Sequence, residues 1–338
     1  MPRTIVIGGG ISGVACAAAL NDRGHSVTLL DKGRVLGGRM ASRRIRDSGT
    51  PSDGHVVDIG ASYFTAQHER FRSLIERLVG LGVVRAWTDT FHVASSEGIL
   101  GVKTGPMRYT ANSGLRSIVE HLASELRDTA VMSSHDSGPI SVEEGALTVN
   151  GEMVDAVAVC MPSPQARQLL NSTSPALAAA LDATHEVAWE PVIAVTAVFD
   201  EATWREFDGI FVNDDPVITW IANDGSRRGN GAPVLVAHVQ PVLAARYLTD
   251  PSQVLPAALG ALKRVLGISE NPSWADAKRW TYAKPLTASP QPFFLHPGIN
   301  LGLAGDAWSD GPRVETAWLS GHLLGEALAD RLETGATR

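Results

Sequence analysis

The residues with the clearest chemical role in this chain are three glycines close to its start. Gly8, Gly10 and Gly13 follow the pattern Gly-x-Gly-x-x-Gly, and Ser12 lies inside it. The first glycine permits a tight turn, the second lets a pyrophosphate approach the backbone, and the third lets a helix pack closely on a strand. Asp31 follows Gly13 by 18 residues, a position from which a carboxylate accepts hydrogen bonds from an adenosine ribose. The spacing predicts a dinucleotide-binding site.

Such a site needs a strand, a helix and a second strand around the glycines, and the sequence predicts all three. Thr4–Ile7 is a short β-branched apolar segment, typical of a strand buried on both faces. Ile11–Arg23 has helical spacing and ends before Gly24, and Ser26–Leu30 is a second apolar strand. Strand, helix and strand in about thirty residues predict a βαβ unit with parallel strands. The helix N-terminus then offers its free N–H groups to the phosphates.

A second group of glycines follows the acidic end of that strand. Gly37-Gly38-Arg39 can bring a guanidinium onto the pyrophosphate, and we expect the neighbouring Lys32 at the same cofactor. Gly-Gly-Arg at this place resembles the second fingerprint of the amine-oxidase-like flavoprotein superfamily, which uses FAD. Longer segments resemble the bacterial renalase branch of that superfamily, and they are residues 37–42, 58–66, 279–285 and 313–321. The resemblance spans the chain in order but is thin across residues 165–270.

The resemblance implies one FAD, bound by both ends of the chain. It implies that Asp306, after the apolar strand that ends at Gly305, accepts a hydrogen bond from the ribityl chain. A helix that begins near Val314 would direct its N-terminus at the flavin N1–C2=O edge, where negative charge develops on reduction. The expected cofactor-binding residues are Gly8, Gly10, Ser12, Gly13, Asp31, Lys32, Gly38, Arg39, Asp58, Ile59, Gly305, Asp306 and Val314. Neither Cys16 nor Cys160 lies in an attachment motif, so we expect FAD to be bound non-covalently.

Proteins of this branch oxidise misreduced nicotinamides, the 2- and 6-dihydro isomers of NAD(P), to NAD(P)⁺ and pass the electrons to O₂, which gives hydrogen peroxide. A dihydropyridine needs only a hydride acceptor, so the flavin carries the chemistry and no catalytic side chain is expected. The sequence agrees, because it has no metal-ligand spacing, no Gly-x-Ser-x-Gly motif and no catalytic His/Cys pair. The expected substrate residues are Tyr63, Trp220, His238, Tyr282 and Lys284.

Four of these five substrate residues also have a plainer interpretation. Tyr63, Trp220 and His238 would equally suit buried core positions, and Lys284 would suit the surface. The chain also departs from the branch's usual pattern: Lys284 replaces an arginine, Ser62 replaces a glutamine, and residues 306–308 extend a shorter segment. Two other functions therefore stay open. One is a flavin amine oxidase or related desaturase, and the other is an FAD- or NAD-binding protein without turnover.

Composition and charge limit the classes of partner. Hydrophobic residues make up 44% and charged residues 19% of 338 residues, which is typical of about two globular domains. The net charge is −7 without a block of Lys or Arg, which argues against nucleic acid as a partner. No segment approaches the ~18 apolar residues of a membrane span, and no signal-peptide pattern occurs. With two cysteines only, we expect a cytoplasmic protein, and the sequence does not indicate its oligomeric state.

The remaining pattern predicts an α/β protein with a Rossmann-like FAD-binding domain, doubly wound around a mainly parallel sheet. We expect this domain in residues 1–70, 105–164 and 280–338. An inserted α+β substrate-binding domain with a largely antiparallel sheet would take residues 71–104 and 165–279. Residues 32–58 are expected as a loop and Asn150-Gly151 as a hairpin turn. Further helices are expected at Phe71–Val79, Leu115–Leu126, Ala257–Leu266 and Arg313–Arg331, and strands at Val154–Val159, Val192–Phe199, Val217–Ile221, Val234–His238, Trp280–Pro285 and Ile299–Ala304.

Overall fold

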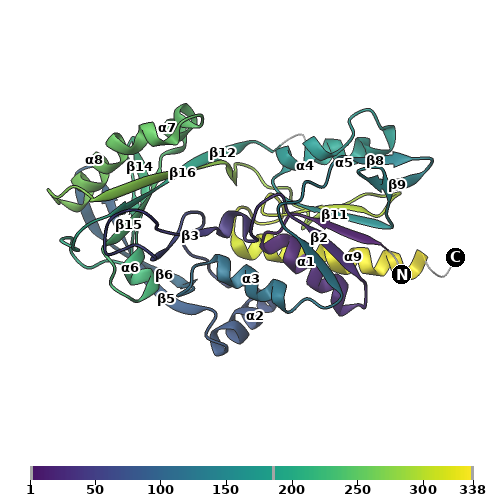
Figure 1. Ribbon diagram of the computed structural model, residues 1–338, viewed down its shortest axis with the longest axis horizontal. Helices are drawn as coiled ribbons and strands as arrows, with labels where there is room; N and C mark the ends of the chain where they lie inside the picture. Colours follow the sequence, from purple (N-terminus) through teal and green to yellow (C-terminus); the bar gives the residue numbers. More distant parts are fainter. Residues whose placement is uncertain (1–2, 185–186, 336–338) are drawn as a thin grey trace. The chain divides into compact units, whose positions relative to one another are not determined.

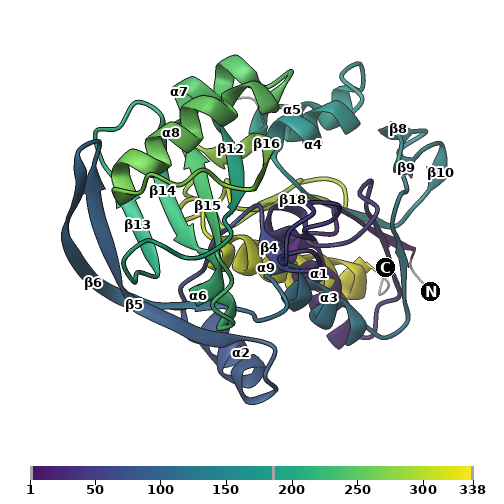
Figure 2. The same ribbon diagram turned by 60° about the vertical axis from the view of Figure 1, so that its left-hand side comes forward.

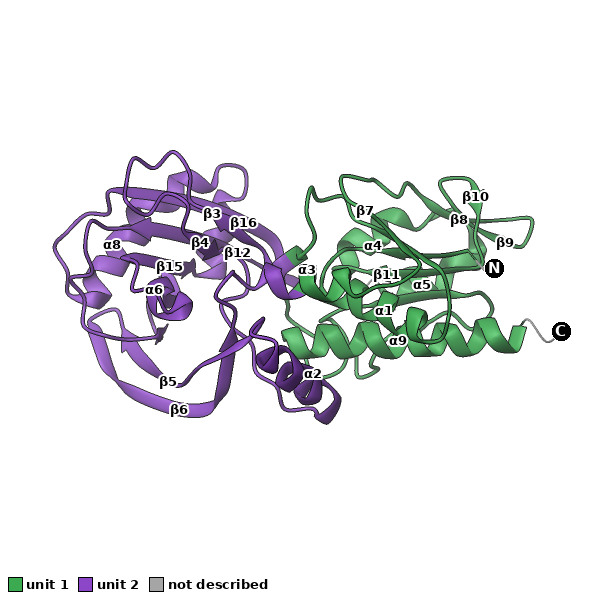
Figure 3. Ribbon diagram, turned by 60° about the horizontal axis from the view of Figure 1, so that its bottom comes forward, with its two compact units in different colours: residues 1–38, 119–188, 284–338 green, residues 39–118, 189–283 purple. Residues whose placement is uncertain are grey.

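The computed structural model describes residues 3–184 and 187–335. The chain forms two compact units, each assembled from separate stretches of sequence (Figure 3). Unit 1 comprises residues 1–38, 119–188 and 284–338, and unit 2 comprises residues 39–118 and 189–283.

Unit 1 is built on a six-stranded sheet in the order β17-β18-β11-β1-β2-β7. Its strands are β1 (Thr4–Ile7), β2 (Val27–Leu30), β7 (Thr129–Met132), β11 (Ala156–Cys160), β17 (Phe294–Leu295) and β18 (Leu301–Ala304). Neighbouring strands pair in parallel except for β17 and β18, which are antiparallel. The βαβ unit and the mainly parallel sheet expected from the sequence are thereby confirmed.

Two helices of unit 1 pack unusually close together. They are α1 (Ile11–Asp22) and α9 (Val314–Gly335), which lie side by side in Figure 1. A Cβ atom on Gly321 would lie 1.9 Å from the Ser12 carbonyl oxygen, and one on Gly325 would lie 2.5 Å from that of Cys16. These glycines let the backbones of the first and last helices of the chain touch.

The other elements of unit 1 are short. They are the helices α4 (Ser163–Leu169) and α5 (Ala178–Ala183), the 3-10 turn Pro175–Leu177, and a three-stranded sheet of β8 (Ile140–Glu143), β9 (Ala146–Val149) and β10 (Glu152–Met153). Asn150 and Gly151 have φ values of 52° and 77°, so the expected hairpin turn is confirmed. Helix α3 (Arg116–Ser124) crosses the boundary between the units.

Unit 2 is built on a seven-stranded sheet in the order β16-β12-β15-β14-β13-β5-β6. Its strands are β5 (Arg85–Ser95), β6 (Gly98–Thr110), β12 (Trp189–Val198), β13 (Gly209–Val212), β14 (Ile218–Asn223), β15 (Val234–Val239) and β16 (Trp274–Pro285). The two-stranded sheet of β3 (Ser42–Arg44) and β4 (Val56–Asp58) and the helices α2 (Glu69–Gly80), α6 (Asp224–Arg228), α7 (Pro241–Ala244) and α8 (Leu255–Leu266) complete it, with 3-10 turns at Gly38–Met40, Ala245–Tyr247 and Pro251–Val254.

The two faces of this sheet carry different cores. Alternate residues of β15 separate them: Leu235 and Ala237 belong to one cluster, and Val234 and Val236 belong to the other. Helix α8 covers the first face through residues such as Leu262 (Figure 2). The second face carries a cluster rich in aromatic residues, which includes the candidate substrate residues Tyr63 and Trp220. The expected antiparallel second sheet is confirmed, apart from the parallel pairing of β13 with β5.

The structure differs from the sequence expectations in two places. Residues 32–58 are not all loop, since β3 and β4 pair within them. The units also divide the chain at other positions than the expected domains. Residues 39–70, 105–118 and 280–283 fall in unit 2, where the Leu115 N–H donates to the Asp58 carboxylate. Residues 165–184 fall in unit 1, where the Asn171 N–H donates to the Ile140 carbonyl. Among the residues described, no helix is long and apolar enough to cross a membrane.

Candidate functional site

The glycine loop after β1 shows which of its glycines the fold itself requires. A Cβ atom on Gly8, whose φ is +113°, would lie 2.3 Å from the Cys160 carbonyl oxygen, and one on Gly13 would lie 1.8 Å from that of Gly8. A Cβ atom on Gly10 would meet nothing within 4 Å. Gly8 and Gly13 therefore serve the packing of strand and helix, whereas Gly10 faces open space at the loop.

The second glycine pair lies against this loop. The Gly37 N–H donates to the Gly9 carbonyl at 2.8 Å, and a Cβ atom on Gly38 would lie 3.3 Å from the Gly10 Cα. Asp31 joins the same arrangement, because its carboxylate accepts hydrogen bonds from the Gly9 N–H and, at 2.5 Å, from the Gly33 N–H. The two motifs that are separate in sequence thus form one backbone cradle at the ends of β1 and β2.

The cradle has the properties that a diphosphate group requires. The N-cap residue of helix α1 is Gly10, which has no side chain to accept hydrogen bonds from the N–H groups of the first turn. The Ser12 hydroxyl is buried and has no hydrogen-bond partner among the described residues. With the open space at Gly10, these features fit an anionic group bound through backbone and hydroxyl donors.

The C-terminal motif reaches the same edge of the sheet. Ile7 pairs with Leu30 and with Val159, and Val159 pairs with Leu303, so the carboxyl ends of β1, β2, β11 and β18 are level. Gly305 follows β18 with a φ of +147°, and its N–H donates to the Ser320 hydroxyl at 3.0 Å. Asp306 is buried beside it, and α9 begins at Val314. The structure therefore brings together the two halves of the predicted cofactor site within unit 1.

Three of the predicted cofactor residues have other surroundings. The Lys32 side chain is 85% exposed and pairs with Asp136 at 3.1 Å. The Arg39 guanidinium, in unit 2, lies 5.2 Å from the centre of the Trp189 ring and donates to the Ala283 carbonyl at 3.2 Å. The Asp58 carboxylate is fully buried and is occupied by protein donors. Contacts of these residues with a cofactor stay predictions.

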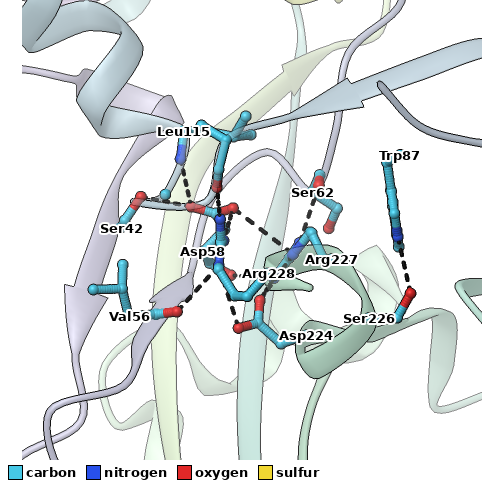
Figure 4. A network of polar contacts seen from close by, with 12 residues as sticks. Ser42, Val56, Asp58, Ser62, Trp87, Leu115, Asp224, Ser226, Arg227 and Arg228 are labelled. Atoms are coloured by element: carbon cyan, nitrogen blue, oxygen red, sulfur yellow. Dashed lines mark hydrogen bonds and ion pairs between the residues drawn. The ribbon is translucent and has the colours of Figure 1, made fainter. Parts of the chain in front are cut away.

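Asp58 belongs to a buried ionic cluster in unit 2, which we call the Asp58 network and which consists of Asp58, Asp224, Arg227 and Arg228 (Figure 4). Arg228 binds the Asp58 carboxylate, and Arg227 donates to Asp224 through its Nε at 2.8 Å. The Asp58 carboxylate also accepts hydrogen bonds from the Ser42 hydroxyl at 2.5 Å and the Leu115 N–H at 2.8 Å. All four charged side chains are at most 2% exposed.

The network fixes charge states as well as positions. Burial by itself would raise the pKa of Asp224, but the guanidinium groups of Arg227 and Arg228 hold it well below the usual range. His55 Nε2 lies 2.7 Å from the Asp224 carboxylate, and the amide nitrogen of Asn230 lies 3.2 Å from His55 Nδ1. Because an amide nitrogen only donates, Nδ1 accepts and Nε2 carries the proton that bonds to Asp224.

The network holds the backbone of residues 58–62. Arg227 donates to the Ser62 carbonyl at 3.0 Å, and the Trp280 indole donates to the Ile59 carbonyl at 2.5 Å. The Ile59 N–H in turn donates to the Ala41 carbonyl at 3.1 Å. Since both backbone groups of Ile59 are used, this segment is rigidly placed where it leads into Tyr63.

Tyr63 is part of an aromatic cluster, which we define as Tyr63, Trp87, Phe91, Phe211 and Trp220. The ring centroids of Phe91 and Trp220 are 4.8 Å apart, and those of Tyr63 and Phe91 are 5.1 Å apart. The Trp220 indole donates to the Ser62 hydroxyl at 3.0 Å, so Ser62 anchors the cluster to the segment that the network holds.

The structure therefore gathers three predicted substrate residues, and the other two lie elsewhere. His238 stands opposite Trp220 in the antiparallel pair β14–β15, so both side chains lie on the aromatic face of the sheet. Tyr282 packs against Trp189, with ring centroids 6.3 Å apart, and the exposed Lys284 belongs to unit 1.

Sequence reasoning missed the charged residues around this cluster. Asp224, Arg227 and Arg228 come from a five-residue helix between two buried strands. The usable signal was an aspartate followed by arginines three and four positions later, next to apolar strands. Arg108, whose guanidinium lies over the Phe91 ring, carried no comparable signal.

Comparison with known proteins places this arrangement among related sequences. Residues 99–324 match the family of flavin-containing amine oxidoreductases, and residues 6–78 match the NAD(P)-binding Rossmann-like domain. Polyamine oxidase 5 of Oryza sativa subsp. japonica is 39% identical over 89 residues, which are 26% of this chain and only 17% of that protein.

Two solved structures share the fold over nearly the whole chain. A candidate protoporphyrinogen oxidase from Exiguobacterium sp. 255-15 superimposes with a TM-score of 0.75 at 17% identity, covering 98% of this chain and 99% of the other. The cyclohexylamine oxidase from Brevibacterium oxydans IH-35A superimposes with a TM-score of 0.73 at 14% identity and the same coverage. At these identities the similarity establishes the fold alone.

Proposed function

The chain belongs to the family of flavin-containing amine oxidoreductases, with FAD as its cofactor, and from that premise we propose that it oxidises the 2- and 6-dihydro isomers of NAD(P). The products would be NAD(P)⁺ and, with O₂ as the electron acceptor, hydrogen peroxide. The proposal assigns FAD to the cradle of unit 1, bound non-covalently, and the dihydronicotinamide ring to the aromatic cluster of unit 2.

FAD supplies a hydride acceptor when it is bound, and the residues of unit 1 account for its binding. The open space at Gly10 and the unpartnered Ser12 hydroxyl suit the diphosphate, and Asp31 lies at the strand end that suits a ribose. The N-terminus of α9 at Val314 would favour negative charge on the flavin ring. No residue in this group needs to exchange a proton.

One observation carries the choice of substrate, and it concerns the carboxylates next to the aromatic cluster. Asp58 and Asp224 are both buried and paired with arginines, so neither is available as a general base. Amine oxidation requires the substrate amine to lose its proton, whereas a dihydropyridine becomes aromatic by losing hydride alone. A site at which these two buried acids are committed to arginines suits the second reaction.

The runner-up is a flavin amine oxidase. Polyamine oxidase 5 and cyclohexylamine oxidase are both named for amine substrates, which favours this alternative. A protein that binds FAD without turnover is the third possibility.

Anaerobic reduction of the bound flavin decides between the three functions. The purified protein would be mixed with 2- and 6-dihydroNAD(P), with ordinary NADPH, and with polyamines, cyclohexylamine and L-amino acids, and the flavin absorbance would be followed. The proposal expects prompt bleaching by the dihydro isomers and recolouring by air with formation of hydrogen peroxide. Bleaching by amines alone would establish the amine oxidase, and no bleaching by any member of the panel would leave a cofactor-binding protein.

A further inference from the structure

A buried cation that no carboxylate neutralises lies against the aromatic cluster. Arg108 lies in β6 immediately after its exposed stretch, and its side chain turns inward so that the residue is only 7% exposed. Its guanidinium carbon lies 4.1 Å from the centre of the Phe91 ring, and it donates to the Asp89 carbonyl. Among the described residues it forms no ion pair, although buried arginines are usually paired.

Neighbouring charges do not offset this cation. The Asp58 network contains two carboxylates and two guanidinium groups, so its charges cancel. The Asp89 side chain is exposed to water and bonds to the Thr90 hydroxyl at 2.8 Å. The Asp208 carboxylate accepts from the Ser226 hydroxyl, to which the Trp87 indole donates, and it interacts with the positive charge of Arg85. Arg108 therefore adds one positive charge beside the aromatic cluster that no carboxylate pairs with.

Arg108 also acts on Tyr63, the residue of the cluster with a phenolic hydroxyl. Burial raises the pKa of Tyr63, and the opposing effect of the Arg108 charge is smaller, so the phenol keeps its proton. Its O–H is therefore a hydrogen-bond donor for another group. The ring of Tyr63 is only half-buried, so this donor lies at the border of the cluster.

We propose that Arg108 and Tyr63 select the substrate by charge. The Tyr63 O–H binds a neutral or anionic hydrogen-bond acceptor, such as a carboxamide or carboxylate on an aromatic ring, and the Arg108 charge repels ammonium groups. Both residues determine specificity, Tyr63 through its O–H and Arg108 through its positive charge. The inference rests on the proposed function for one step, the assignment of the aromatic cluster to the substrate.

Three ligands that share one ring and differ in charge test this selection. Benzoate, benzamide and benzylamine, which is an ammonium ion at pH 7, would be titrated anaerobically into the FAD-loaded protein, and dissociation constants read from the flavin absorbance. The wild type should bind benzoate most tightly and benzylammonium least. Arg108→Gln should reduce the ratio of benzoate to benzylammonium affinity by about tenfold or more, because loss of the positive charge weakens the binding of the anion and strengthens that of the cation. An unchanged ratio would overturn the proposal.

Matched variants separate the charge from other effects. Arg108→Lys keeps the charge and should keep most of the ratio. Arg44→Gln removes one positive charge from an exposed site in the same unit, away from the cluster, and should leave the ratio as it is. If Arg108→Gln does not fold, the variants Arg108→Lys and Tyr63→Phe test the proposal instead. Tyr63→Phe should weaken the binding of benzamide by about 3- to 10-fold, and benzoate should still bind more tightly than benzylammonium. Undiminished benzamide binding would refute the role of Tyr63.

Failure of this inference can be told apart from failure of the proposed function. If dihydronicotinamides bleach the flavin but the Arg108 variants do not alter the charge order, the function stands and the selection is wrong. If amines bleach the flavin and dihydronicotinamides do not, the function is wrong, whatever the charge order.

Discussion

Gly8, Gly10 and Gly13 belong to one motif, but their positions require glycine for different reasons. Side chains at Gly8 or Gly13 would collide with backbone oxygen atoms of unit 1, so substitutions there disturb the fold before any ligand is considered. Gly10 has open space around its Cβ position. It is therefore the residue at which cofactor binding can be impaired while the protein itself remains folded.

Replacing Gly10 by Ala should lower FAD occupancy sharply and leave the stability of the apoprotein nearly unchanged. The added methyl group occupies space that the diphosphate needs, and overpacking of this kind costs about 1–3 kcal/mol, or about 5- to 150-fold in affinity. Flavin-to-protein stoichiometry after purification and thermal unfolding of the apoprotein measure the two effects. Gly260→Ala, in open space on α8, is the matched control. A Gly10→Ala protein that purifies with full flavin content would refute the cradle.

The two cysteines lead to a second prediction at this scale. Both are buried, and the interaction of the Cys16 thiol, as donor, with Cys160, together with burial, raises the pKa of Cys16 well above its ordinary value. A thiol that stays protonated is a poor nucleophile, which argues against attachment through Cys16, and Cys160 is buried at the end of β11, so neither cysteine should attach to the flavin. FAD should therefore remain in the supernatant after acid precipitation. Yellow colour in the washed pellet would establish a covalent bond.

Among the elements, helix α6 has only five residues but supplies most of the Asp58 network. It supplies Asp224, Arg227 and Arg228, and through them it ties Asp58, Ser62 and Ala111 to one point. A buried ionic cluster contributes little net stability, because desolvation offsets the attraction between its charges. Removing one member is costly, however, since the remaining charge is left unpaired.

Asp224→Asn should lower the free energy of unfolding at pH 7 by about 3–5 kcal/mol. The folded-state pKa of Asp224 is depressed, so its stabilisation is present above the unfolded pKa and declines as pH falls below about 4. The difference between wild type and Asp224→Asn should therefore shrink from pH 5 to pH 3, as measured by urea unfolding. Asp330→Asn breaks an exposed pair with Arg23 and should change stability by at most about 1 kcal/mol at any of these pH values. A difference independent of pH would contradict the ionised state of Asp224.

The elements also show how far sequence patterns reach. β1, α1 and β2 were predictable within a residue or two, because apolar spacing and the glycines act locally. The pairs β3–β4 and β5–β6 were not predicted. Most of β6 is exposed, so it lacks the alternation that identifies a half-buried strand. Arg108, Arg227 and Arg228 were also missed, since burial of a charge depends on partners distant in sequence.

At the scale of the whole molecule, the two units differ in how well their candidate sites could be predicted from the sequence. In unit 1, the expected cofactor residues belong to short sequence motifs that follow strands whose carboxyl ends lie at the same edge of the sheet. These motifs could therefore be recognised from the sequence alone. The aromatic face of unit 2 draws Tyr63, Phe91 and Trp220 from three separate segments, and the resemblance to known flavoproteins was weakest there. The proposed substrate is consequently assigned to unit 2, the part of the chain where sequence patterns were least informative.

The reaction itself provides the last prediction. If hydride transfer needs no side-chain acid or base, Tyr63→Phe and His238→Ala should weaken or misplace the substrate without abolishing flavin reduction. Each deletes one orienting contact, which is worth about 1–3 kcal/mol, or about 5- to 150-fold in rate. The single-turnover reduction rate with 2- or 6-dihydroNAD(P) should also vary little between about pH 6 and 9. Burial raises the pKa of Tyr63 against the opposing effect of Arg108, so its hydroxyl stays a donor over this range.

Stopped-flow measurement of that rate across the pH range, for the wild type and both variants, tests the prediction. A steep rise of the wild-type rate with pH would mean that a base or a neutral amine is required, and the assignment would move to an amine oxidase. Loss of the pH-dependent rise in His238→Ala would then identify His238 as that base. A flat profile in all three proteins, with slowed but persistent reduction in the variants, is expected for a site in which side chains only orient the ring.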